Sequence, residues 1–97
     1  MKWLGLFEMD SKDVDVNIKK YQEALASREK GEQRFPKQVF ESHVFVGKNN
    51  GVVIYDEGTT TEQLINISLH FKDTVKWEFK PIVEASKSIE IYLKTKK

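Results

Sequence analysis

The chain has 97 residues, of which 39% are hydrophobic and 32% charged, and its 16 basic and 15 acidic residues give a net charge of +1 at pH 7. This length predicts a single domain, because two separate hydrophobic cores would need a longer chain. The even charge balance argues against a nucleic-acid partner, which requires a clustered excess of Lys and Arg. The absence of cysteine excludes disulfides, thiol nucleophiles and Cys-ligated metal sites.

No targeting or membrane-spanning pattern is visible in the sequence. The N-terminal apolar run, residues 1–7, is shorter than a signal-peptide core and leads directly into Glu8 and Asp10. No stretch approaches the ~20 apolar residues of a spanning helix. We therefore predict a soluble, cytoplasmic protein with no membrane partner.

The first third of the chain predicts a strand followed by a helix. Residues 1–9 are apolar on both faces at their centre and charged only at the ends, which is typical of a central strand covered on both sides. The acidic and serine residues within 10–13 then supply helix-start chemistry. An apolar stripe at steps of four, three and four predicts an amphipathic helix that ends before Gly31. This stripe consists of Val14, Ile18, Tyr21 and Leu25.

The middle of the chain predicts a β-hairpin. Residues 39–46 and 52–56 are rich in β-branched and aromatic side chains, as strands are. Between them lies the sequence Lys-Asn-Asn-Gly at residues 48–51. Because Asn and Gly tolerate the positive φ that hairpin turns require, we place the turn there.

The last third predicts a helix, an edge strand and a short final segment. Thr59 and Glu62 have the spacing of a capping box, so we expect a helix from about residue 60 to residue 71. Residues 75–79 alternate apolar with charged side chains, and the following Pro81 suits an edge strand. Residues 84–97 fit either a helix or a fifth strand, and their pattern favours the helix.

This order of elements predicts an α+β fold of the ferredoxin-like βαββαβ kind, with one domain over residues 1–97 and residues 84–97 as a C-terminal appendix. Right-handed crossovers place the first and third strands at the centre of a four-stranded antiparallel sheet, with both helices on one face. Leu4, Leu6 and Phe45 are then left on the open face, together with Val53 or Tyr55. Because an exposed apolar sheet is an aggregation hazard, we predict a homodimer that covers it by sheet-to-sheet packing.

The opening residues Met1-Lys2-Trp3-Leu4, with Phe7, resemble the first strand of a family of small proteins of unknown function in the dimeric α+β-barrel superfamily. Residues 31–36, Gly-Glu-Gln-Arg-Phe-Pro, are also similar, as are the hairpin into residues 51–55 and the late strand over 75–83. The resemblance implies a ferredoxin-like chain that pairs into a dimeric α+β barrel. It implies no particular activity, because superfamily relatives include cofactor-independent monooxygenases, isomerases, haem-handling enzymes and ligand-sensing regulators.

We expect any site to lie on the open sheet face, because small-molecule sites combine an apolar floor with a few polar groups. His43 and Glu41, two residues apart on one strand, are the candidate catalytic pair, with His43 as the proton-transfer group near neutral pH. The alternative is a polar edge strand whose charges discourage pairing. The candidate ligand-binding residues are Leu4, Leu6, Tyr55 and Glu78.

The sequence favours a non-enzymatic function. It contains no phosphate loop, nucleophile elbow or recognisable pair of catalytic carboxylates. Its two histidines, His43 and His70, fall on different elements, so we predict no metal site and no cofactor. We therefore expect a homodimeric ligand-binding or structural module, with a small molecule as candidate ligand. The alternative is a cofactor-independent enzyme, of the monooxygenase or isomerase kind, with its site between the two sheets of the dimer.

Overall fold

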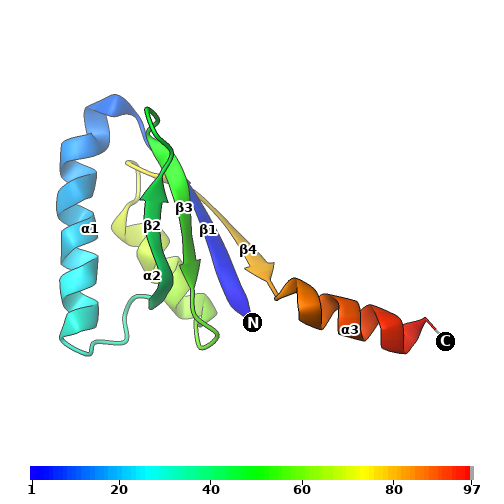
Figure 1. The fold of residues 1–97 in the computed structure, drawn as a ribbon. Helices are drawn as coiled ribbons and strands as arrows, with labels where there is room; N and C mark the ends of the chain where they lie inside the picture. Colours follow the sequence, from blue (N-terminus) through cyan, green and yellow to red (C-terminus); the bar gives the residue numbers. More distant parts are fainter. Residues whose placement is uncertain (97) are drawn as a thin grey trace.

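The computed structural model describes residues 1–96 as an α+β fold built on a four-stranded antiparallel sheet (Figure 1). The sheet order is β2-β3-β1-β4, which confirms the predicted central position of the first and third strands. No helix within these residues is long and apolar enough to cross a membrane. In chain order the elements are β1 (Lys2–Glu8), the 3-10 turn η1 (Ser11–Asp13), α1 (Val14–Glu29), β2 (Gln38–Val44), β3 (Asn50–Tyr55), α2 (Thr61–His70), β4 (Lys76–Ile82) and α3 (Ala85–Thr95).

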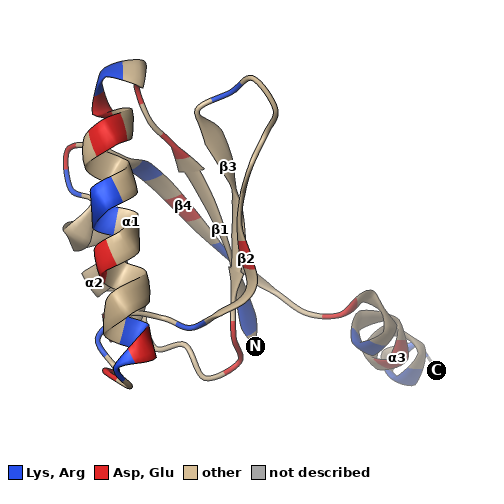
Figure 2. Cartoon of the chain, turned by 60° about the vertical axis from the view of Figure 1, so that its left-hand side comes forward, with Lys and Arg blue, Asp and Glu red and all other residues tan. Residues whose placement is uncertain are grey.

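Helices α1 and α2 lie on the same face of the sheet, as predicted, and charges of both signs alternate along α1 (Figures 1 and 2). The core lies between these helices and the sheet. One buried cluster contains Ala24, Phe35, Ile67 and Phe71, and a second contains Val53, Tyr55 and Leu64. Trp77 and Phe79 of β4 pack against both clusters, and their rings stack 5.2 Å apart. The aromatic residues therefore serve as core packing.

The hairpin forms, but its turn falls earlier than the Asn-Asn-Gly sequence predicts. Gly47 adopts the positive φ of 76°, and β3 already begins at Asn50. Gly51 therefore lies inside the strand, where its lack of a side chain has another use. A Cβ atom at Gly51 would lie 1.9 Å from the backbone oxygen of His43 on β2. Glycine at this position permits the close approach of the two strands.

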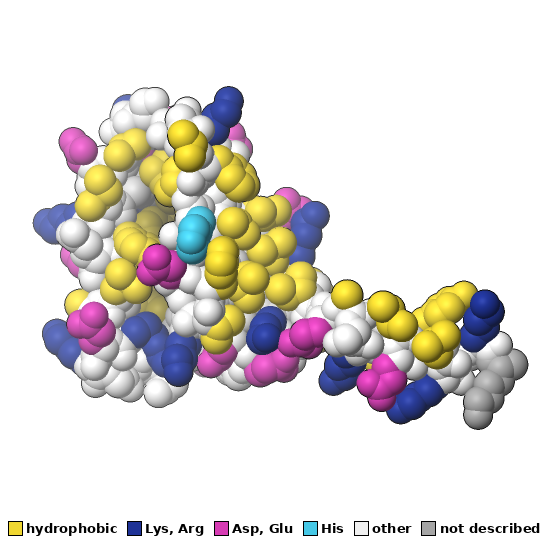
Figure 3. Space-filling view, viewed as in Figure 1, with side chains coloured by type: hydrophobic (Ala, Val, Ile, Leu, Met, Phe, Trp, Pro, Cys, Tyr) yellow, Lys and Arg dark blue, Asp and Glu magenta, His cyan; other side chains and the backbone are white. Residues whose placement is uncertain are grey.

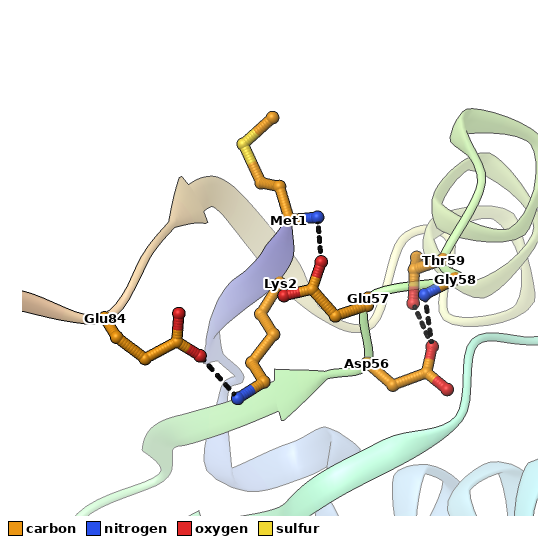
Figure 4. A network of polar contacts seen from close by, with 7 residues as sticks. All are labelled: Met1, Lys2, Asp56, Glu57, Gly58, Thr59 and Glu84. Atoms are coloured by element: carbon orange, nitrogen blue, oxygen red, sulfur yellow. Dashed lines mark hydrogen bonds and ion pairs between the residues drawn. The ribbon is translucent and has the colours of Figure 1, made fainter. Parts of the chain in front are cut away.

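Helix α2 begins with a capping box one residue later than the sequence predicts. The Thr60 hydroxyl accepts a hydrogen bond from the Gln63 amide at 3.1 Å, and the Gln63 side chain accepts one from the Thr60 amide at 3.0 Å. The predicted cap, Thr59, instead donates its hydroxyl to Asp56 at 3.3 Å, in the turn that follows β3 (Figure 4). Thr59 thus belongs to the turn after β3, and Thr60 caps the helix.

Replacing the capping residue tests this assignment. We expect Thr60→Ala to lower the free energy of unfolding by about 1 kcal/mol, because it leaves the Gln63 amide without its acceptor. Thr59→Ala is the matched control and should cost less, since it removes only one hydrogen bond in an exposed turn. Urea denaturation followed by circular dichroism measures both. A larger loss of stability for Thr59→Ala than for Thr60→Ala would indicate that Thr59 caps the helix, as the sequence predicts.

Within the predicted appendix over 84–97, residues 85–95 form a helix, the alternative that the sequence favours, and Lys97 lies outside the described residues. Two residues, Val83 and Glu84, connect it to β4. Lys2 donates a hydrogen bond from its ammonium to Glu84 at 2.9 Å, which lowers the pKa of the Glu84 carboxyl (Figure 4). The N-terminal amine pairs similarly with Glu57, after the end of β3. Two ion pairs thus link the start of β1 to segments far away in the sequence.

Candidate functional site

A groove of about 940 Å³ opens between α1 and the sheet, and hydrophobic side chains line both of its sides (Figure 3). Its volume falls within the ~300–1,000 Å³ that is usual for small-molecule sites. Four aliphatic residues on its two walls remain 36–57% exposed: Ile18 and Leu25 from α1, and Val39 and Val44 from β2. Core aromatics of the sheet, and Phe71 directly after α2, close its inner end, and those of the sheet include Phe7, Tyr55 and Trp77.

The way α1 contacts the sheet creates this groove. The residues of α1 that are buried are Asn17 and Ala24, which are 3% and 7% exposed. In the apolar stripe that the sequence predicts, Tyr21 packs against the core and also lines the groove, whereas Val14, Ile18 and Leu25 line the groove alone. We expected any site to lie on the open face of the sheet, whereas this groove lies on the helix-covered face. Helix α1 packs along one line and leaves its larger apolar residues facing open space.

Three buried polar atoms among the groove-lining residues have no hydrogen-bond partner within residues 1–96. They are Asn17 Oδ1, Arg28 Nε and Trp77 Nε1. The other ends of two of these side chains are held, because Asn17 Nδ2 donates to Thr74 O at 3.0 Å and Arg28 Nη1 donates to Phe35 O at 3.2 Å. An unpaired buried polar atom costs about 1–3 kcal/mol. All three atoms are inaccessible to solvent, so they lie beneath the walls of the groove and not on its open surface.

A chain of hydrogen bonds links the two walls of the groove. Tyr21 on α1 donates its hydroxyl to the Gln38 side-chain oxygen at 3.3 Å, and the Gln38 amide donates to Ser42 Oγ at 3.2 Å. Tyr55 lies among the groove-lining residues, and burial raises the pKa of its phenol well above the usual value. The hydroxyl and amide groups of this chain can orient a polar group of a ligand.

The opposite, open face of the sheet carries most of the sequence-predicted site. Leu4 lies between Ile54 and Lys80 in the sheet, and Leu6 lies between Val52 and Glu78. His43 is opposite Val52 on the next strand. The structure therefore brings Leu4, Leu6, His43 and Glu78 to one face, as predicted. We call this surface the open face, and its apolar centre consists of Leu4, Leu6, Phe40, Val52 and Ile54.

The predicted pair of His43 and Glu41 does not form. A bulge in β2 between Phe40 and His43 shifts the register, so that these two rings stack 4.3 Å apart. The His43 Nδ1 donates to the backbone oxygen of Glu41 at 2.6 Å, and Glu41 lines the groove on the helix side. The prediction that both side chains share a face is wrong, because a bulge adds one residue to a strand and reverses the alternation after it.

Tyr55 also lies on the other side from its predicted position. It is 3% exposed and belongs to the buried cluster with Val53 and Leu64, under the helices. Its sheet partners are Trp3 on β1 and Gln38 on β2. The near-continuous apolar run of β3 has no period of two, so the sequence could not assign its faces.

His70 has a structural position between the two helices. Its Nε2 donates to the backbone oxygen of Lys20 on α1 at 2.8 Å, and its ring lies 5.0 Å from that of Phe35. It therefore joins α2 to α1 at the end of the core. Within residues 1–96 no group of three or more potential metal ligands comes together.

Comparison of the sequence with models of known protein families and with curated proteins gives no match. A functional assignment therefore depends on the groove and the open face.

Proposed function

We propose that this protein is a non-enzymatic binding module for an apolar small molecule, which lies in the groove between α1 and the sheet. The observation that carries the proposal is the groove itself, about 940 Å³ in volume, with four aliphatic wall residues left exposed. Exposed apolar walls around a concave site gain free energy when a ligand removes them from water, at about 25 cal/mol per Å².

The residues that line the groove, which are mostly apolar and include Arg28, indicate the class of ligand. Trp77 Nε1 and Arg28 Nε are donors, and Arg28 also carries a positive charge. A hydrophobic molecule would fill the apolar walls, and a carboxylate at one end would be attracted to the positive charge of Arg28. Fatty acids and related amphiphiles have this chemistry.

A ferredoxin-like fold and pairing through the open face belong to the same proposal. The sheet order β2-β3-β1-β4 supports the fold, since it matches the βαββαβ arrangement that the sequence predicts. The apolar centre of the open face supports a homodimer of the dimeric α+β-barrel kind, because a soluble chain rarely leaves such a surface uncovered. A cytoplasmic location stays a prediction from the sequence.

The enzymatic alternative has weaker support. It requires a general base beside the bound molecule, and His43 is the candidate on the open face. The Glu41 side chain lies on the helix-covered face of the sheet, away from His43. Within residues 1–96, His43 therefore has only a backbone oxygen as its hydrogen-bonding partner. The groove offers a shaped apolar site on the opposite face, and this favours binding over catalysis.

Binding of the fluorescent apolar probe N-phenylnaphthylamine tests the groove. We use the Trp3→Phe background, because the chain has 2 tryptophans and Trp77 lines the groove. Energy transfer from Trp77 to the probe then reports occupancy at that site. We expect Ile18→Asp to weaken probe affinity at least tenfold, because it places a carboxylate on an apolar wall.

The matched control is Val16→Asp on the same helix. Val16 is 42% exposed, close to the 52% of Ile18, but it does not line the groove. This variant should retain the probe affinity of the parent protein. Equal affinity in both variants, or equal loss in both, would rule out the groove as the binding site.

A further inference from the structure

Helix α3 extends away from the rest of the molecule (Figure 1). None of its described residues is buried. The radius of gyration of the chain is 15.4 Å, whereas a compact chain of this length has about 12.5 Å. Among the described residues, one side-chain hydrogen bond or ion pair joins residues 83–96 to the rest of the chain. It is the contact between Glu84 and Lys2. The single chain therefore leaves α3 without a packing partner.

The sequence of α3 nevertheless has the pattern of a packed helix. One side is apolar and carries Ile89, Tyr92 and Leu93, which are 58%, 58% and 61% exposed. The opposite side carries Lys87, Glu90 and Lys94, the last two paired at 3.3 Å, together with Ile91, which is 53% exposed. A helix of 11 residues is marginal in water when nothing packs against it. The apolar side therefore requires a complementary surface.

The open face is such a surface, and its dimensions match those of α3. The outer strands of a four-stranded sheet lie about 14 Å apart, at ~4.8 Å between neighbours. A helix with its side chains is about 10–12 Å across, so this face is wide enough to hold α3. Figure 3 shows hydrophobic side chains on the open part of the sheet and along α3 in the same view of the molecule. Each of these surfaces lacks cover in the single chain, and each is apolar.

Helix α3 does not cover the open face of its own chain. Its connection to β4 consists of only Val83 and Glu84. Glu84 has an extended backbone, with φ of −59° and ψ of 139°. The contact between Glu84 and Lys2 holds this connection at the end of β1. A second copy of the chain presents the same two surfaces. A twofold arrangement covers both helices and both open faces at once, and leaves no unmatched surface for further growth.

We propose that α3 of each copy packs its Ile89, Tyr92 and Leu93 side on the open face of a second copy. This inference rests on the proposed pairing of two copies, and it places α3 of the partner, in place of the partner's sheet, on the open face. The exchanged helix removes its own apolar side chains and those of the partner's sheet from water in one interface.

The molar mass in solution is the first test. Light scattering at micromolar concentration should give twice the chain mass of 11.3 kDa for the wild type. The double variant Ile89→Glu/Leu93→Glu should give the mass of one chain, because it places two carboxylates in the apolar contact. Lys87→Glu, on the charged side of the same helix, is the control and should remain a dimer.

Disulfide trapping is the second test, and the absence of cysteine from the natural sequence makes it specific. A Tyr92→Cys chain is mixed with a Leu6→Cys chain and oxidised mildly. We expect a mixed disulfide between the two chains, because residue 92 of one copy lies on the open face of the other. The Lys87→Cys chain mixed with Leu6→Cys should give no more mixed disulfide than the unfolded proteins.

The outcomes separate the inference from the proposal on which it rests. A monomeric wild type would overturn both the pairing and the exchange of α3. A dimer that survives Ile89→Glu/Leu93→Glu and gives no mixed disulfide would overturn only the exchange, and leave direct sheet-to-sheet pairing. A dimer lost in the double variant, together with the mixed disulfide, supports the exchanged helix.

Discussion

Gly51→Ala is expected to lower the free energy of unfolding by more than about 3 kcal/mol, beyond the usual cost of overpacking. The added Cβ would lie 1.9 Å from the backbone oxygen of His43 and 2.7 Å from the ring of Phe7. The first neighbour belongs to the backbone of β2, so relief of the clash requires that β2 separate from β3. A domain of this size has about 5–15 kcal/mol of total stability. The variant should therefore unfold at much lower urea concentration.

Gly58→Ala is the control for this substitution. The nearest atom to a Cβ at Gly58 is Asp56 Oδ1 at 3.7 Å, which is an ordinary contact. Gly58 therefore tolerates alanine, and we expect its stability to remain within about 0.5 kcal/mol of the wild type. If urea denaturation gives the two variants equal stability, β2 and β3 do not approach as closely as described.

Tyr55→Ala is expected to cost about 3–5 kcal/mol, the range for removal of a buried aromatic ring. Tyr55 is 3% exposed and packs with Val53 and Leu64 under the helices. Tyr55→Phe is the matched control, because it keeps the ring and removes only the hydroxyl, and should cost less than about 1.5 kcal/mol. A loss of stability below about 1 kcal/mol for Tyr55→Ala would indicate that Tyr55 lies on the exposed face of the sheet.

We also expect the stability of the wild type and that of Tyr55→Phe to depend differently on pH. Burial raises the pKa of Tyr55 above the ordinary tyrosine value of 10.0. Above that value the unfolded chain ionises this phenol while the folded chain keeps it neutral, so the unfolded state binds fewer protons and stability falls as pH rises. Tyr55→Phe should remove this part of the fall. Urea denaturation at neutral and alkaline pH measures it, and parallel curves for the two proteins would contradict the burial of Tyr55.

The local pattern of the sequence was sufficient for the elements and for the layout of the sheet. The strand at residues 1–9 is apolar on both faces, and the structure places β1 at the centre of the sheet. Gly31, with a positive φ of 81°, follows the end of α1 as predicted. Pro81 lies in the edge strand β4, where its missing N–H breaks no ladder. Each of these features depends on neighbours within a few residues, which a sequence displays directly.

Tertiary packing alone decided which face several side chains occupy. The bulge in β2 separates Glu41 from His43, and the pairing of Tyr55 with Trp3 directs its ring under the helices. Both depend on how one strand aligns with the next. Because a shift of one residue moves every following side chain to the opposite face, an alternating pattern cannot by itself predict the composition of a site.

The groove and the projecting helix α3 also separate what the sequence predicts from what tertiary packing decides. The apolar stripe of α1 and the apolar side of α3 are visible in the sequence, because helical periodicity depends only on residue type and spacing. What each stripe faces depends on the distance between elements that are remote in the chain. Asn17 and Ala24 set α1 against the core and leave its stripe along the groove, and a two-residue connection directs α3 away from its own sheet. The sequence thus determined which surfaces are apolar, and only the tertiary structure decided which of them remain uncovered.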